Sequence, residues 1–134
     1  MKTAQDIIAA YLASFNGGDW PGMLVLLADD VVHDTNQGGA EHGKPAFATF
    51  LDRMARCYRE ELRDIMVMAS PDGSCGAAEF QVHGVYLAQD AGLPPARGQR
   101  YALPAGAFFS LKDGRISRVT MYYNLPEWLR QVAA

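Results

Sequence analysis

Asp34 is the residue best placed to do chemistry in this sequence of 134 residues. It ends a short apolar segment, residues 31–34, and a polar stretch rich in glycine follows from residue 35 to residue 43. A carboxylate in that position can border a cavity, where loss of water raises its pKa and makes it a usable base near neutral pH. The competing interpretation is structural, because such an Asp often caps a turn through Thr35 or Asn36.

Tyr11 is the second candidate, and it lies in the middle of the apolar face of the first predicted helix. A buried tyrosine hydroxyl needs a hydrogen-bond partner. As a donor, it could polarise a carbonyl group or stabilise an enolate. The alternative is a core tyrosine whose hydroxyl is bonded to a backbone carbonyl.

A row of polar side chains occupies one face of the predicted strand 76–87. Glu79, Gln81 and His83 alternate along it, so they line either a cavity or an outer face that meets solvent or a second subunit. General burial preferences favour the outer face. His83 could supply a second acid or base. His33 alternates with Asp34, so His33 points outward if Asp34 points inward.

No arrangement of ligands in the sequence predicts a metal or another cofactor. The two cysteines, Cys57 and Cys75, form no CxxC pair and have no histidine close in sequence. They are expected to be reduced thiols of a cytoplasmic protein, both buried or half-buried, although a pairing between them stays open. No nucleophile elbow and no phosphate-binding loop is present.

The composition predicts one domain, residues 1–134. Twelve basic and 15 acidic residues give a net charge of −3, and 49% of the residues are hydrophobic. This balance disfavours nucleic-acid binding. No apolar run approaches the roughly 20 residues of a membrane helix, and the N-terminus has no export signal. We therefore expect a cytoplasmic protein that binds neither membranes nor nucleic acids.

Aromatic residues are the one clear excess, with six Tyr, six Phe and two Trp. Tyr58, Tyr101 and Tyr122 join Tyr11 as candidates for a cavity wall with hydroxyls that face a ligand. Trp20 either covers this cavity or joins the first two helices.

Hydrophobic periodicity predicts the elements that must position these residues. Helical spacing predicts a helix over 3–16, a short helix after Asp19, one from Pro45 to Tyr58 and a last one from Pro126. Strands are predicted at 31–34, 62–69, 76–87, 99–112 and 115–123. The last four are joined by short turns or a loop and must be antiparallel. Pro104 and Gly106 indicate a bulge or a strand edge. A sheet kinked at such a bulge would bend around the helices and leave a conical cavity.

Four segments resemble a known superfamily: "AYLASFNGGDWPGMLVLLADDVVHD", "GKPAFATFL", "ARGQRYALPAGAFFSLKDGRISRV" and "MYYNLPEWLRQ". They are similar to nuclear transport factor 2-like proteins, and within that superfamily to ketosteroid isomerase-related proteins and SnoaL-type polyketide cyclases. The resemblance implies an α+β fold in which a cone-shaped, strongly bent antiparallel sheet wraps around N-terminal helices. It also implies a homodimer formed through the outer sheet face.

The same resemblance implies roles for two residues. Asp34 matches the general-base aspartate of ketosteroid isomerase, and Tyr11 matches its oxyanion-donating tyrosine. The second donor, an acid expected near Gly106, is absent. Asn124 stands where SnoaL-like relatives often carry an acid, and an amide there cannot act as a base.

These observations lead to competing hypotheses of function. In the first, Asp34 removes a proton next to the carbonyl of a small apolar ligand and Tyr11 donates to the enolate, as in an isomerase; a cyclase or dehydratase is a variant. In the second, the pocket binds an apolar or aromatic metabolite without chemistry. In the third, side chains fill the cavity and the role is structural. The expected ligand-contacting residues are Trp20, Asn36, Tyr58, Glu79, His83, Tyr101, Tyr122 and Asn124.

Overall fold

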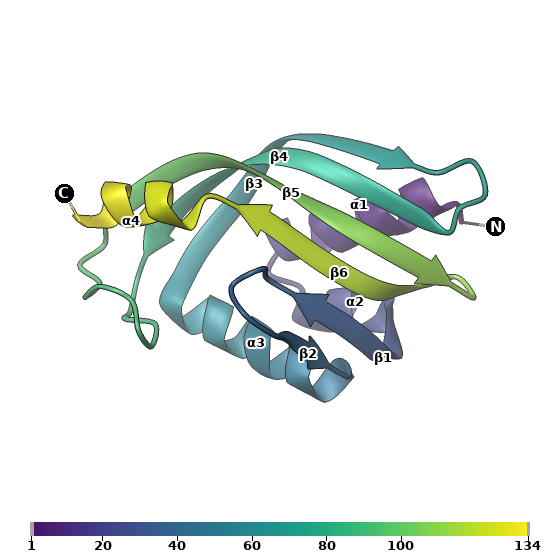
Figure 1. Ribbon diagram of the computed structural model, residues 1–134, viewed down its shortest axis with the longest axis horizontal. Helices are drawn as coiled ribbons and strands as arrows, with labels where there is room; N and C mark the ends of the chain where they lie inside the picture. Colours follow the sequence, from purple (N-terminus) through teal and green to yellow (C-terminus); the bar gives the residue numbers. More distant parts are fainter. Residues whose placement is uncertain (1, 134) are drawn as a thin grey trace.

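The computed structural model describes residues 2–133, which form four helices and six strands (Figure 1). The helices are α1 (Ala4–Asn16), α2 (Trp20–Val25), α3 (Lys44–Cys57) and α4 (Leu125–Ala133). The strands are β1 (Leu27–Asp34), β2 (Ala40–His42), β3 (Tyr58–Ala69), β4 (Cys75–Tyr86), β5 (Arg100–Lys112) and β6 (Arg115–Tyr123).

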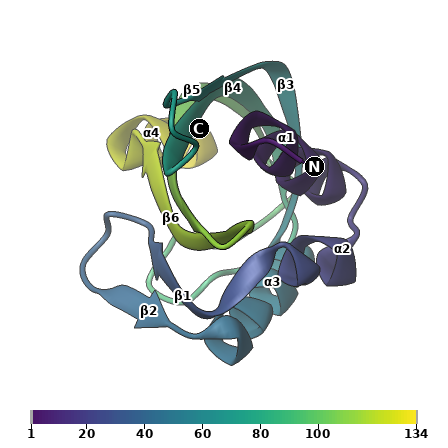
Figure 2. The same ribbon diagram turned by 90° about the vertical axis from the view of Figure 1, so that its right-hand side faces the viewer.

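One curved, unclosed sheet organises the molecule, with strand order β2-β1-β6-β5-β4-β3. Strands β3 to β6 are antiparallel neighbours in chain order, as their short connections predict, and β1 runs parallel to β6. Seen end-on, the strands curl around, with α1 beside β3 and α3 below β1 (Figure 2). The predicted α+β fold with a strongly bent sheet around N-terminal helices is confirmed.

The first helix begins where its capping signal predicts. The Thr3 hydroxyl accepts a hydrogen bond from the Asp6 amide at 3.1 Å, and the Asp6 carboxylate accepts one from the Thr3 amide at 3.2 Å. Its buried face carries Ile7, Ile8, Tyr11 and Leu12 against the sheet. None of the helices within residues 2–133 is long and apolar enough to span a membrane.

Three boundaries differ from the sequence-based prediction. Strand β1 starts at Leu27 and not at residue 31, and β2 lies inside the expected loop 35–43. Strand β3 starts at Tyr58, although the helical pattern was expected to include that residue and the strand to begin at 62. Pairing across the sheet explains the early start, because Tyr58 is opposite Tyr86 and Glu60 is opposite Gly84.

Of the two interpretations of Pro104 and Gly106, a bulge or a strand edge, the bulge is wrong. The pairing of β4 with β5 is regular there, and the register shifts lie elsewhere, between Leu27 and Val32 in β1, between Arg63 and Met66 in β3 and after Ser110 in β5. Pro104 is tolerated inside β5 because β6 ends at Tyr123, opposite Ala105. Beyond that pair no strand within residues 2–133 lies on the β6 side of β5, so the missing N–H of proline breaks no ladder there.

Candidate functional site

The concave side of the sheet encloses an inner cavity of about 480 Å³. Its walls come from β3, β4, β5, β6, α3, α4 and the loops that follow β1 and β4. Apolar side chains make most of the lining, and they include Phe50, Met54, Val82, Leu93, Leu103 and Trp128. Eight polar side chains also line it: Thr35, Gln37, Arg53, Tyr58, Glu60, Asp90, Tyr101 and Tyr123. A largely apolar space with a few converging polar groups is typical of a small-molecule site.

The Glu60 carboxyl group is the most enclosed acid of this cavity. The Tyr101 hydroxyl donates a hydrogen bond of 2.5 Å to Glu60 Oε2. Burial raises the pKa of Glu60 above its ordinary value, and the hydrogen bond from Tyr101 opposes that shift only in part. Burial, together with the neighbouring Glu60, also raises the pKa of Tyr101, so its phenol stays protonated.

Gly84 makes the contact between Glu60 and Tyr101 possible. Within the sheet, Gly84 lies between them, paired with Glu60 on β3 and with Tyr101 on β5. A Cβ atom at residue 84 would overlap the Tyr101 ring and its hydroxyl oxygen. The missing side chain therefore lets the Tyr101 ring cross β4 and reach the carboxyl group on the next strand.

A second phenol–carboxylate pair lines the same cavity. The Tyr58 hydroxyl donates to Asp90 Oδ2 at 2.8 Å, and Arg53 Nε lies 3.6 Å from Asp90 Oδ1. The guanidinium group of Arg53 also lies over the Phe50 ring, 5.5 Å from its centroid. Desolvation and the hydrogen bond to Asp90 raise the pKa of Tyr58, so this phenol is also protonated. Asp90 thus has both a donor and a counter-charge, whereas no salt bridge involves Glu60 among residues 2–133.

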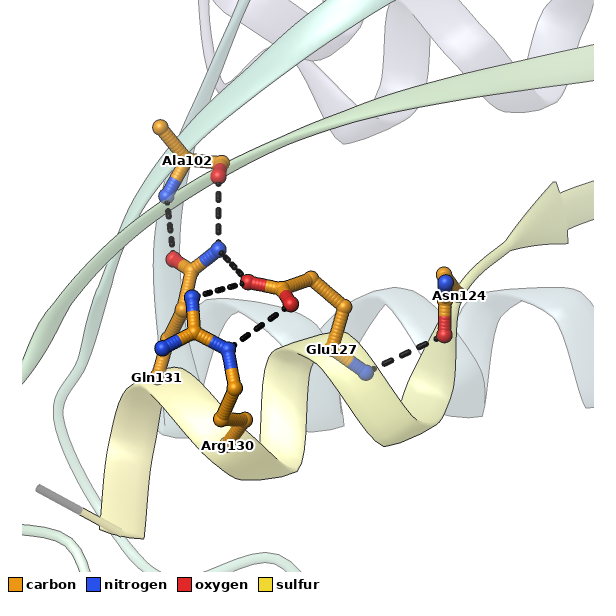
Figure 3. A network of polar contacts seen from close by, with 5 residues as sticks. All are labelled: Ala102, Asn124, Glu127, Arg130 and Gln131. Carbon is orange, nitrogen blue, oxygen red and sulfur yellow. Dashed lines mark hydrogen bonds and ion pairs between the residues drawn. The ribbon is translucent and has the colours of Figure 1, made fainter.

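The position of α4 depends on a network of polar contacts with β5 (Figure 3). The Gln131 side chain exchanges two hydrogen bonds of 2.9 Å with the backbone of Ala102 and donates a third to Glu127 at 2.7 Å. Arg130 also donates to Glu127, and Asn124 Oδ1 accepts from the Glu127 amide, which caps the helix. Trp128 of this helix then packs edge-on against three tyrosine rings, those of Tyr58, Tyr86 and Tyr101.

The outer face of the sheet carries a second, more open depression of about 580 Å³. It is lined by Met68, Glu79, Pro104, Phe108, Tyr122 and Asn124, among others. Phe108 and Tyr122 contact each other edge to face, with ring centroids 5.4 Å apart, and about half of each side chain is exposed. We call this depression the outer groove.

Comparison with known proteins identifies the family. Residues 8–119 match the model of the SnoaL-like domain. The chain belongs to the SnoaL-like family. A search of curated proteins finds no match to this SnoaL-like chain.

Solved structures agree with this assignment. The SnoaL-like chain is 57% identical to a candidate polyketide cyclase from Pseudomonas putida KT2440, with a TM-score of 0.97 over 98% of this chain and 99% of the other. It is 56% identical to a candidate polyketide cyclase from Xanthomonas campestris pv. campestris, with a TM-score of 0.92 over 96% of each chain. An NTF2-like protein of unknown function from Burkholderia pseudomallei K96243 is 18% identical, with a TM-score of 0.82 over the whole of both chains, and shows the fold alone.

In this SnoaL-like domain, neither Asp34 nor Tyr11 lines the inner cavity or the outer groove. Asp34 Oδ1 accepts a hydrogen bond of 2.7 Å from the Asn36 amide, as in a capped turn. Tyr11 is buried edge-on against Phe47 and Phe109. Burial raises the pKa of Tyr11, so it is a protonated core phenol.

The alternation of His33 and Asp34 requires a correction. Of these two neighbours His33 is the one that points inward, because it is 3% exposed and packs against Phe47 and Phe50. The arrangement in which Asp34 points inward and His33 outward is therefore not the one found. Its Nδ1 has no hydrogen-bond partner among residues 2–133. Desolvation lowers the pKa of His33, which keeps the imidazole neutral.

The structure brings together only two of the expected ligand-contacting residues in the inner cavity, Tyr58 and Tyr101. Four others, Asn36, Glu79, Tyr122 and Asn124, line the outer groove. His83 shares the outer face with Glu79 and lines neither space. Trp20 packs against Phe15 with centroids 5.9 Å apart, which joins α1 to α2.

Glu60, Asp90, Arg53 and Trp128 were not among the expected site residues, although they line the cavity. Glu60 stands in a run, "YREEL", that is typical of a solvated segment. A signal was present, because Tyr58, Glu60 and the buried Leu62 alternate and so share one strand face. The signal can be recognised only when β3 is known to start at Tyr58, because a strand that begins at residue 62 leaves out Tyr58 and Glu60. Residues 2–133 contain no group of three or more His, Cys, Asp and Glu side chains that could hold a metal.

Proposed function

We propose that this SnoaL-like domain binds a small, largely apolar carbonyl compound in the inner cavity and transfers a proton next to the carbonyl group. The observation that supports this proposal is the Glu60 carboxyl group, enclosed on the cavity wall and held by Tyr101. Its raised pKa brings the acid closer to neutral pH, where a general base works best.

The proposed chemistry begins with Glu60 as a carboxylate. It takes a proton from the carbon next to the ligand carbonyl, and the C–H electron pair moves to the carbonyl oxygen to form an enolate. Return of the proton to another carbon completes an isomerisation. Attack of the enolate carbon on a second carbonyl carbon closes a ring, and the alkoxide that forms takes the proton back from Glu60. The names of the two closely similar structures support this cyclase variant. Tyr101 is a positioning residue that orients the base.

The hypothesis that Asp34 is the base and Tyr11 the donor stays a prediction. Its support comes from the match to ketosteroid isomerase. The geometry favours Glu60 instead, because Asp34 is engaged in a turn and lies outside the cavity lining.

One set of variants separates the two assignments. The ligand is first identified by mass spectrometry of what co-purifies with the protein, and turnover is then measured for Glu60→Gln, Asp34→Asn and the control Glu61→Gln. Glu61 is exposed and adjacent to Glu60 on the opposite strand face. We expect Glu60→Gln to lower kcat by about 100-fold or more and the other two to stay near wild type. Loss of turnover in Asp34→Asn alone would make Asp34 the base and reject Glu60.

Non-catalytic binding is the second candidate, and one observation favours it. The hydroxyls of Tyr101 and Tyr58 each donate a hydrogen bond to a carboxyl group of the protein itself, so these two donors are already engaged. A co-purified metabolite that stays unchanged during long incubation with the protein, while its affinity is retained, would support this role.

We also propose that the protein is a homodimer formed through the outer groove and the sheet around it. Met66, Met68, Phe108 and Tyr122 expose large apolar side chains on this face, as expected of an interface. Light scattering of the purified protein tests the proposal, with Phe108→Asp expected to give monomers. Monomeric wild type at micromolar concentration would reject it.

A cytoplasmic location is the last part of the proposal. Both cysteines, the buried Cys57 and the exposed Cys75, are free thiols, as is usual in a reducing compartment. Cell fractionation of the host that carries the gene tests this location.

A further inference from the structure

We propose that Tyr123 donates the hydrogen bond that holds the ligand's carbonyl oxygen in the inner cavity. This inference rests on the proposed function, since it supplies the oxyanion donor that the enolate needs and that Glu60 and Tyr101 do not provide. It assigns a contact with the reacting atoms to a residue that sequence reasoning did not select.

The position of Tyr123 brings its ring to the cavity. It is the last residue of β6 and shares a strand face with Met121 and the fully buried Val119, whereas Tyr122 points to the outer groove. Tyr123 is paired with Ala105 of β5, and both line the inner cavity and the outer groove. The phenol therefore stands at the boundary between the two spaces, 37% exposed.

Its hydroxyl is distinguished from the other phenols near the cavity by having no partner. Tyr101 donates to Glu60, Tyr58 donates to Asp90, and Tyr86 donates to Pro94 O at 2.6 Å. Among residues 2–133, no hydrogen bond engages the Tyr123 hydroxyl. A polar group on an otherwise apolar cavity wall without a protein partner is available to a ligand.

Tyr123 and the proposed base Glu60 line the same cavity, and their charges interact. Burial is the main cause that raises the pKa of Tyr123, followed by the charges of Glu60 and Asp90, with Arg53 opposing them. The phenol thus stays protonated at neutral pH and serves as a donor. Glu60 and Asp90, the two carboxyl groups whose charges act on it, line the same cavity.

Glu60 and Tyr123 then act at opposite ends of the enolate, the base at the carbon and the hydrogen-bond donor at the oxygen. As Glu60 accepts the proton from carbon, negative charge develops on the carbonyl oxygen, and the Tyr123 O–H stabilises that charge without giving up its proton. No co-reactant is needed. Loss of a single oxyanion donor typically lowers the rate by about 100-fold or more.

The test uses two probes of similar shape, 2-acetylnaphthalene and 2-ethylnaphthalene, of which only the first has a carbonyl group. Their dissociation constants are measured for the wild type, Tyr123→Phe and the control Tyr122→Phe. Phenylalanine keeps the ring, so the wall between the two spaces remains. We expect Tyr123→Phe to weaken the ketone by about fivefold and leave the hydrocarbon unchanged, and Tyr122→Phe to change neither.

The infrared carbonyl stretch of the bound ketone gives a readout that a purely structural role would not move. We expect a lower frequency in the wild type than in Tyr123→Phe, because a hydrogen bond weakens the C=O bond. Equal frequencies and equal ketone affinities would overturn the inference while leaving the binding cavity in place. A loss in Tyr122→Phe instead would locate the site in the outer groove. Failure of both probes to bind the wild type would count against the proposed function itself.

Discussion

The Tyr101 hydroxyl reaches the Glu60 carboxyl group across an intervening strand, and it does so over Gly84. The three residues are neighbours in one row across β3, β4 and β5. The outer two meet because the middle one has no side chain. This row holds the proposed base in place and leads to the first prediction.

Gly84→Ala will destabilise the protein and separate Tyr101 from Glu60. The added Cβ would overlap the Tyr101 ring, which must then leave its place against Trp128. We expect the free energy of unfolding to fall by about 1–3 kcal/mol, as for overpacked cores, measured by urea denaturation. Gly17→Ala is the control, since its φ of −83° suits any residue and an added Cβ would meet only the Ala13 and Ser14 carbonyl oxygens, at 3.5 and 3.8 Å. Equal stability of the two variants would contradict the described packing.

The Glu60 carboxyl group will contribute less to the stability of the protein as the pH rises. Its folded-state pKa lies above the ordinary value of 4.5, so the neutral acid is the form that favours folding. Its contribution is fully present below pH 4.5 and is lost as the pH rises through the folded-state pKa. We expect Glu60→Gln to gain stability relative to the wild type over that range, measured by thermal unfolding from pH 4 to pH 8.

The control for this pH series is Glu61→Gln, which changes an exposed carboxylate of the same strand. Its stability relative to the wild type should show no such rise with pH. A Glu60→Gln profile parallel to that of the wild type would mean that the Glu60 carboxyl group is not desolvated in the folded state.

Tyr86→Phe will loosen the loop that carries Asp90. The fully buried Tyr86 donates to Pro94 O at 2.6 Å and accepts from the Asp90 amide at 3.1 Å, so one hydroxyl joins both arms of the loop. We expect a loss of about 1–2 kcal/mol and faster amide exchange in residues 87–99. Tyr122→Phe, which has an exposed ring, should change neither measurement.

Gln131→Ala will release α4 from β5. It removes both hydrogen bonds between the helix and the Ala102 backbone (Figure 3). We expect a loss of about 1–2 kcal/mol and a change in the fluorescence of Trp128, which this helix carries. Arg130→Ala, which breaks only an exposed ion pair with Glu127, should have little effect. A larger loss for Arg130→Ala than for Gln131→Ala would contradict this account of the anchoring.

Most of the fold could be predicted from local patterns. The capping box at Thr3, the helical spacing of Ile7 to Leu12 and the tight turn at Asp113 and Gly114 depend on residues close in sequence, and the structure contains each of them. The early start of β3 could not be predicted that way. Its first residues are polar or aromatic in a pattern that also suits a helix end, and their pairing with β4 decides that they form a strand.

The site was less predictable, for a related reason. Periodicity assigns Glu79 and His83 to one face of β4 but does not say which face is concave, and the curvature of the sheet turns that face outward. The same applies to Asp34 and His33. Periodicity does not say which of the two points inward, and in the structure it is the His33 imidazole that packs against Phe47 and Phe50.

The sequence by itself determined the fold class, the family and the abundance of phenols, because these depend on composition and on patterns that repeat along the chain. Only the tertiary structure decided which acid and which phenols share the cavity. Glu60, Gly84 and Tyr101 are far apart in sequence and become neighbours through strand register. Whether a phenol is bound to a carboxyl group, like that of Tyr101, or free, like that of Tyr123, depends on which strands the bent sheet brings together.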